Sequence, residues 1–160
     1  MNKILFIDID GVLVTPWSLS QPQIAIDDIT YYEPYAAESV DALNMLISHF
    51  NADIVIHSTR RYQYSLEEFQ EIWRISGILF NKLSVLPRYG DMEDQWFNSP
   101  NEEKEYDLKR FIAKYAVQKE DYLILEDISL KMPNLYLVDS NTGLTTDDAE
   151  KIISLPGIDV

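Results

Sequence analysis

Two aspartates separated by one residue, Asp8 and Asp10, precede Gly11 at the end of an apolar run near the amino terminus. If this run is a β-strand, side chains two residues apart point to the same face, and the two carboxylates lie side by side. Such a pair repels itself unless a cation neutralises it, and carboxylate oxygens are ligands that Mg²⁺ takes in proteins. Gly11 then permits a tight turn out of the strand. The pattern predicts a divalent-metal site, with a plain turn at a strand end as the alternative.

Polar residues also follow a second apolar run, at Ser58, Thr59, Arg60 and Arg61. A buried guanidinium needs a partner, so two consecutive arginines at a strand end are unusual for a protein core. The planar fork of an arginine matches an oxyanion with two hydrogen bonds, and we expect Arg60 to bind one. Arg61 is a second candidate for this contact or, equally, a solvated surface residue. The preceding His57 is expected to be a packed side chain rather than a metal ligand.

The elements that must position these residues alternate along the chain. Short apolar runs rich in Ile, Leu and Val predict strands that are buried on both faces. They cover residues 3–9, 53–56, 122–125 and 135–138. Apolar residues at helical spacing predict helices around residues 40–50, 66–73 and 108–115, and helix-start signals occur at Ser65, Ser99 and Thr145. This alternation predicts an α/β fold with a central parallel sheet, in three layers.

Two polar segments interrupt the alternation. We interpret residues 14–34 and 83–99 as insertions within a single domain that covers residues 1–160. Loops of this length in compact domains are usually functional lids or mobile segments. Several aromatic side chains in or near them are candidates for stacking on bases or, more simply, for packing. These are Tyr31, Tyr32, Tyr35, Tyr62 and Tyr64, while Trp17, Trp73 and Trp96 are expected to be core or flap anchors.

The composition excludes several kinds of chemistry. The chain has 160 residues, with 13 Lys and Arg against 27 Asp and Glu, which gives a formal net charge of −14. This charge repels the phosphates of extended duplex nucleic acid. The absence of cysteine excludes disulfides, a thiol nucleophile and a cysteine-ligated zinc, and it fits a reducing compartment. No apolar run approaches the roughly 18 residues that a membrane span needs, so we expect a cytoplasmic protein without a membrane partner.

The sequence DIDGVL at residues 8–13, after an apolar strand, resembles the first motif of the haloacid dehalogenase (HAD) superfamily of phosphohydrolases. The other motifs of that family are a Ser or Thr after the second strand, a Lys near the start of a later helix, and an acidic pair after a further strand. In this chain they fall at Ser58 or Thr59, at Lys104 in preference to Lys109, and at Glu126-Asp127. The tail LVDSNTGLT, residues 137–145, is similar to the ending of a small HAD group associated with RNA-repair proteins. The resemblance implies a Rossmann-like HAD fold with only short cap or flap insertions.

The resemblance also implies catalytic roles. Asp8 is expected to attack phosphorus and form an aspartyl-phosphate, and Asp10 to serve as general acid and base. Ser58, with Thr59 as the alternative, is expected to hydrogen-bond the transferring phosphoryl group. Lys104 is expected to compensate charge between the nucleophile and the phosphate.

The metal implied by the resemblance is Mg²⁺. It is expected to bind the Asp8 carboxylate and the Asp10 backbone carbonyl. Asp127 is expected to be a direct ligand, and Glu126 a second or water-mediated one. The metal would hold the weakly nucleophilic carboxylate and screen its charge from an anionic phosphate.

The resemblance thus implies a Mg²⁺-dependent phosphomonoester hydrolase. Short flaps leave an open mouth, which suits a phosphorylated small molecule, a nucleotide or the phosphate at a nucleic-acid end. Extended duplex nucleic acid is not expected, because binding it requires Lys and Arg to neutralise phosphates. Two other classes stay open: a metal-dependent nuclease that uses the same acids without a covalent intermediate, and a non-catalytic HAD-fold binding or regulatory module.

Overall fold

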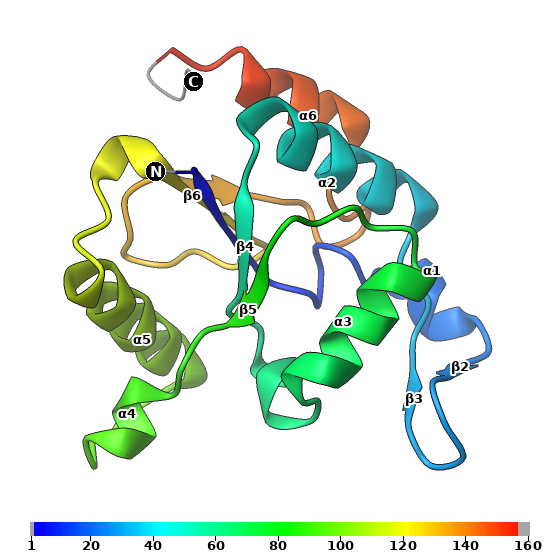
Figure 1. The fold of residues 1–160 in the computed structure, drawn as a ribbon, viewed down its shortest axis with the longest axis horizontal. Coiled ribbons are helices and arrows are strands. Elements are labelled where there is room, and N and C mark those ends of the chain that lie inside the picture. Colours follow the sequence, from blue (N-terminus) through cyan, green and yellow to red (C-terminus); the bar gives the residue numbers. More distant parts are fainter. Residues whose placement is uncertain (1, 157–160) are drawn as a thin grey trace.

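The computed structural model describes residues 2–156. A five-stranded sheet with the strand order β5-β4-β1-β6-β7 lies at its centre, and all neighbouring strands are parallel (Figure 1). The strands are β1 (Ile4–Ile7), β4 (Asp53–Ile56), β5 (Leu83–Val85), β6 (Tyr122–Glu126) and β7 (Leu135–Leu137). The α/β fold with a parallel sheet is therefore confirmed. None of the helices among the described residues is long and apolar enough to cross a membrane.

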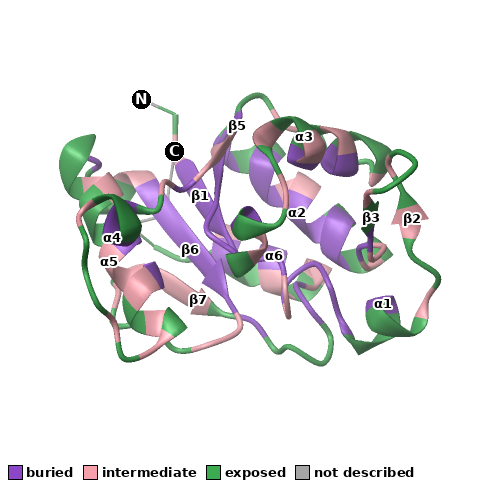
Figure 2. Cartoon of the chain, turned by 90° about the horizontal axis from the view of Figure 1, so that it is seen from below, coloured by how far each residue is buried: buried purple, intermediate pink, exposed green. Residues whose placement is uncertain are grey.

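Side chains of the central strand β1 alternate between two cores, and this alternation creates the three layers. Leu5 and Ile7 face a core shared with α2 (Ala37–Phe50), α3 (Leu66–Ile75) and α6 (Thr146–Ile153). Ile4 and Phe6 face a second core with α5 (Pro100–Lys114). Figure 2 shows the buried strands β1 and β6 between α5 on one side and α2 and α6 on the other. All four residues of β1 are buried, as expected for a strand covered on both faces.

The register of β1 with its two neighbours brings three chain segments to one edge of the sheet. Ile7 pairs with Ile56 of β4 and with Leu125 of β6. The ladder continues one step further, because the Asp8 amide donates to the Leu125 carbonyl over 3.0 Å and the His57 amide donates to the Ile7 carbonyl over 3.0 Å. The residues that follow these three strands therefore meet at the carboxyl edge, where open α/β sheets bind their ligands.

Local signals fix where the helices begin. Ser65, Ser99 and Thr145 are the N-caps of α3, α5 and α6, and each side chain accepts a hydrogen bond from the backbone amide three residues later. These hydroxyl groups satisfy amides that the first turn of a helix leaves without partners. The three predicted helix starts are confirmed.

The insertions differ from the expected ones in their boundaries. The segment predicted as an insertion from residue 83 begins too early, because Leu83–Val85 pairs with β4 as the edge strand β5. A strand of three residues is too short to show a clear pattern in sequence. The short helix α4 (Tyr89–Met92) follows it. Residues 14–34 contain α1 (Pro16–Ser20) and a small antiparallel pair, β2 (Ile24–Ala25) and β3 (Tyr31–Tyr32).

Arg61 belongs to the interior, so the solvated position considered for it is wrong. It lies in the 3₁₀ turn η1 (Thr59–Tyr62), its side chain is 1% exposed, and its Nη2 atom donates to Asp107 Oδ2. Asp107, on α5, also accepts from the Gly90 amide over 2.9 Å. One buried carboxylate thus joins η1, α4 and α5.

Replacing this carboxylate should destabilise the fold. Asp107→Asn keeps an acceptor for Gly90 but leaves the Arg61 guanidinium buried without its counter-charge, which is expected to lower the free energy of unfolding by about 3–5 kcal/mol. Urea denaturation measures the change. The matched control is Glu71→Gln, which removes an exposed ion pair with Arg74 and is expected to leave the midpoint unchanged within error. Equal midpoints for Asp107→Asn and the control would contradict the role of this pair.

Candidate active site

Three carboxylates converge at the carboxyl edge of the sheet. One oxygen of each of Asp8, Glu126 and Asp127 lies within 4.8 Å of the others. Asp8 follows β1, Glu126 ends β6, and Asp127 is the next residue. Asp8 and Glu126 are buried, whereas Asp127 is partly exposed. The structure therefore gathers acids from two strands that are far apart in sequence.

Lys104 supplies the positive charge of this cluster. Its Nζ atom lies 2.9 Å from Glu126 Oε2 and 3.3 Å from Asp8 Oδ2, and its side chain is 7% exposed. Because Ser99 caps α5, Lys104 falls in an early turn of that helix, which lies over the sheet edge. Lys109 instead has an exposed side chain, 3.9 Å from Glu105. The structure places Lys104, and not Lys109, at the acids.

Burial and mutual repulsion shift the pKa values of the acids. Burial and the neighbouring Glu126 raise the pKa of Asp8 well above its usual value, although Lys104 opposes this. Burial would also raise the pKa of Glu126, but hydrogen bonds and the charge of Lys104 hold it below the usual value. Burial and Glu126 raise the pKa of Asp127 to about 6. Burial alone would lower the pKa of Lys104, but the neighbouring carboxylates of Asp8 and Glu126 raise this pKa above its usual value. One ammonium does not balance three carboxylates, so an additional cation is favoured.

The donors at this cluster fit Mg²⁺. Asp8 Oδ1 is buried and has no hydrogen-bond partner among the described residues, so this oxygen is available to a ligand. The carboxylate of Asp127 lies directly over Gly11, where a Cβ atom would stand 2.3 Å from Asp127 Oδ2. An all-oxygen set of carboxylates is the kind that a hard divalent cation prefers.

Asp10 lies outside this cluster, so the expectation that its carboxylate sits beside that of Asp8 is wrong. Its carboxylate accepts from Arg60 Nε over 2.9 and 3.0 Å and from Arg60 Nη2 over 2.7 Å. The strand β1 ends at Ile7, and the chain turns between Ile9 and Val14, where the Ile9 carbonyl accepts from the Leu13 and Val14 amides and Gly11 takes a positive φ of 77°. The alternation of a regular strand therefore does not extend to Asp10, and the guanidinium of Arg60 neutralises its carboxylate.

Arg60 is held by two acids. Besides Asp10, its Nη1 atom lies 2.5 Å from Oε2 of Glu33, in the segment between β3 and α2. Its side chain is 12% exposed. Arg60 therefore connects the loop after β1 to the first insertion, and its binding of an oxyanion stays a prediction. The sequence offered no signal for Glu33, because a single acid in an irregular segment is a common surface feature.

The two hydroxyl residues differ in burial. Ser58 is fully buried and its Oγ atom accepts from the Arg60 amide over 3.2 Å, so Ser58 caps η1. Thr59 is exposed. A role as helix cap thus explains the burial of the Ser58 hydroxyl, and a contact of Ser58 or Thr59 with phosphate stays a prediction.

His57 joins the site through Glu126, which sequence reasoning missed. It is fully buried, as expected for a packed side chain, but its Nε2 atom lies 3.0 Å from Glu126 Oε2. Burial lowers the pKa of His57, which favours the neutral imidazole. The register of parallel strands could have revealed this contact, because a polar residue just after β4 must lie near residues at the ends of β1 and β6.

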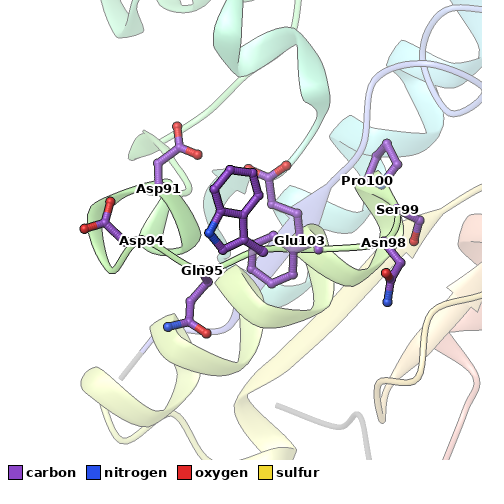
Figure 3. Close-up of a pocket in the computed structure, with 9 residues that line it drawn as sticks. Asp91, Asp94, Gln95, Asn98, Ser99, Pro100 and Glu103 are labelled. Carbon is purple, nitrogen blue, oxygen red and sulfur yellow. The ribbon is translucent and has the colours of Figure 1, made fainter.

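A hollow of about 640 Å³ lies beside the first turn of α5. Trp96, which is 96% exposed, lines this hollow, and Figure 3 shows Asp91 and Asp94 on one side of it and Asn98 on the other. Glu103 also lines it and directly precedes Lys104 in the helix. The hollow and the acidic cluster thus both involve the first turns of α5, and no residue that lines the hollow belongs to the cluster.

The expected anchoring role is wrong for Trp96, which is exposed, and holds for Trp73, which is fully buried in the core. Trp17 is half exposed. Tyr32 and Tyr35 are buried and pack against each other. These two tyrosines therefore serve packing rather than stacking.

Comparison with known proteins identifies a family. Residues 4–149 match the family described as HAD domain in Swiss Army Knife RNA repair proteins. The match includes all of the acids, the lysine and the hydroxyl residues described above. No curated protein matches the chain.

The contact between Gly11 and Asp127 predicts a loss of metal binding in one variant. Gly11→Ala places a methyl group against the Asp127 carboxylate, so the affinity for Mg²⁺ is expected to fall at least about tenfold. Gly77→Ala is the matched control, because Gly77 also has a positive φ, of 81°, but its added Cβ would meet no atom within 4 Å. Both variants carry the backbone strain of about 1–2 kcal/mol. Isothermal titration calorimetry with Mg²⁺ measures the affinity of each variant. Equal affinities for the two variants would contradict the assignment of Asp127 as a metal ligand.

Proposed function

Because the chain belongs to the family of HAD domains in Swiss Army Knife RNA repair proteins, we propose that it is a Mg²⁺-dependent phosphomonoester hydrolase with Asp8 as its nucleophile. One observation carries the proposal: the Lys104 ammonium holds one oxygen of the buried Asp8 while the other, Oδ1, has no hydrogen-bond partner within residues 2–156. A carboxylate fixed by one oxygen and open at the other is suited to attack an electrophile. A lysine beside it also attracts the anionic group that carries this electrophile.

In the first step, an oxygen of Asp8 attacks phosphorus. The new bond between this oxygen and phosphorus forms as the ester bond to the leaving oxygen breaks. Asp10, which takes up a proton from solvent once Arg60 releases its carboxylate, gives that proton to the leaving oxygen. In the second step, water attacks the phosphorus of the aspartyl-phosphate and Asp10 takes the proton of that water. The bond to Asp8 breaks, inorganic phosphate leaves, and both aspartates return to their starting states.

The remaining residues bind and orient the phosphoryl group. Lys104 offsets the charge that accumulates between Asp8 and the phosphate oxygens. We infer that Arg60 exchanges Asp10 for an oxygen of the substrate, which releases the Asp10 carboxyl for proton transfer. Ser58 lies at the start of the same turn, which supports our proposal that its hydroxyl donates to a phosphoryl oxygen.

A bound Mg²⁺ would supply Lewis-acid stabilisation of the phosphoryl oxygens. Asp8 and Asp127 are the carboxylates best suited to hold it, together with the Asp10 backbone carbonyl that the family resemblance implies. Glu126 is less available, since Oε2 accepts from His57 and Lys104 and Oε1 accepts from the Asp127 amide over 3.0 Å. We therefore assign Glu126 a supporting rather than a direct contact.

The two rival classes have less support. A two-metal nuclease requires a second set of ligands, and residues 2–156 contain a single group of acids close enough to share an ion. A non-catalytic binding module does not require the motif residues, yet each of the four motifs has a residue of the required type.

The substrate that we propose is the phosphate at a single-stranded nucleic-acid end or on a nucleotide. Exposed Trp96 offers a flat ring in the hollow at the first turn of α5, and every base has a face that stacks on such a ring. Asn98 and Gln95 line the same hollow and have amides that can bond to base edges. The net charge of −14 disfavours contact with many phosphates at once, so one base and its terminal phosphate fit better than a duplex.

Substitution of the nucleophile tests the reaction. With an aryl phosphate and Mg²⁺, Asp8→Asn is expected to lower kcat by at least about a thousandfold, and Asp10→Asn by about 10²–10⁴-fold. Asp147→Asn, at an exposed position of α6, is the control and keeps wild-type turnover. EDTA abolishes turnover and Mg²⁺ restores it. Full turnover by Asp8→Asn would exclude the covalent mechanism.

Substitution of Trp96 tests the substrate class. Loss of one stacking contact of about 1–3 kcal/mol is expected to lower kcat/KM of Trp96→Ala about 5- to 150-fold for a phosphorylated oligonucleotide. Glycerol phosphate, which has no base, should be hydrolysed as by the wild type. Trp17→Ala, which removes another exposed tryptophan, should change neither value. A loss of equal size on both substrates would refute base stacking at Trp96.

A further inference from the structure

His57 has an unusual position for a histidine, because it is fully buried directly after a central strand. Its amide donates to the Ile7 carbonyl over 3.0 Å, which fixes its backbone to the end of β1. Val55, which lies two residues earlier and therefore on the same face of the strand, is apolar and buried. A hydrophobic residue would therefore fit this environment.

The two ring nitrogens of His57 have different surroundings. Nε2 lies 3.0 Å from Glu126 Oε2, whereas Nδ1 is buried and has no hydrogen-bond partner among the described residues. A carboxylate only accepts, so Nε2 carries the hydrogen and Nδ1 is the bare nitrogen. Burying an acceptor without a partner costs free energy. Packing alone does not account for histidine here, because leucine would fill the space without this cost.

The acceptor of this hydrogen bond is the oxygen that also holds the catalytic lysine. Glu126 Oε2 accepts from Lys104 Nζ over 2.9 Å, and Lys104 Nζ lies 3.3 Å from Asp8 Oδ2. A chain of contacts thus leads from His57 through Glu126 and Lys104 to the nucleophile. Without His57, the Asp127 amide would hold Oε1 and Lys104 alone would hold Oε2. The carboxylate could then pivot about Oε1 and shift Oε2 together with the ammonium.

We propose that His57 is a positioning residue: its Nε2–H fixes the Glu126 carboxylate, which in turn holds the Lys104 ammonium against Asp8. This inference rests on the proposed function, in which Asp8 and Lys104 act on the phosphoryl group. His57 itself touches neither the substrate nor the metal. Its effect is on the rate of the chemical step rather than on ground-state binding.

Two variants of His57 separate positioning from packing. His57→Gln can place an amide N–H where Nε2 stands, whereas His57→Leu fills the space without a donor. Positioning predicts that His57→Leu lowers kcat about 10- to 100-fold with KM changed less than about threefold, and that His57→Gln restores most of the loss. Packing predicts the reverse order, because leucine suits an apolar core and a buried amide does not. Thermal unfolding of both variants verifies that the compared proteins are folded.

A second measurement does not depend on activity. Two-dimensional ¹H–¹⁵N NMR of the imidazole groups in the metal-free wild-type protein is expected to show the Nε2–H tautomer for buried His57, with slow exchange of this hydrogen with water. The ring hydrogens of exposed His49 are expected to exchange rapidly. Hydrogen on Nδ1, or equal kcat for His57→Leu and the wild type, would overturn the proposal. If the wild type hydrolyses no phosphomonoester, the proposed function fails, and the tautomer still decides whether His57 donates to Glu126.

Discussion

The placement of one ammonium group between two buried carboxylates is the interaction on which this site depends. Lys104 Nζ lies within 3.3 Å of both Asp8 and Glu126, and all three side chains are nearly inaccessible to water. Each charge would be strongly unfavourable alone at such depth, because burial penalises an ion that has no partner. Helix α5, which carries Lys104, must therefore pack across the ends of β1 and β6 for the site to exist. The same contact leaves Asp8 Oδ1 without a hydrogen-bond partner in the described part of the chain, so the interaction that stabilises the site also leaves it open to a ligand.

Two adjacent arginines in the turn after β4 serve different purposes. Arg60 binds Asp10 and Glu33 and connects the loop after β1 to the first insertion. Arg61 binds Asp107 in the interior and fixes η1 against α5. Since α5 also carries Lys104, the position of the lysine depends on the Arg61 contact. Arg60, in contrast, lies at the surface side of the turn with a partly accessible side chain, and its proposed exchange of Asp10 for a substrate oxyanion would leave the Arg61 contact intact. The turn thus joins a buried ion pair to a partly exposed one.

The sequence predicted the parallel α/β fold, three helix starts and the motif residues, because these depend on local patterns and on the spacing of chemical groups. The prediction was wrong where contacts between residues far apart in the sequence determine the position of a side chain. Asp10 turns away from Asp8 because the chain leaves the strand earlier than the apolar run suggests, and Arg61 is buried because Asp107, 46 residues later in the chain, is its partner. Neither Glu33 nor the hydrogen bond of His57 to Glu126 was foreseen. Both contacts join residues on different elements, and only the register of the sheet or the path of an irregular segment brings them together.

Trapping of the covalent intermediate tests the central claim most directly. The protein is mixed with Mg²⁺ and a rapidly hydrolysed phosphomonoester, quenched in the steady state and reduced with borohydride, which converts an aspartyl-phosphate to homoserine. Peptide mass spectrometry then locates the modified residue. The account predicts homoserine at position 8 and at no other aspartate. Turnover without modification at this position, or with homoserine at Asp10 or Asp127 instead, would contradict it.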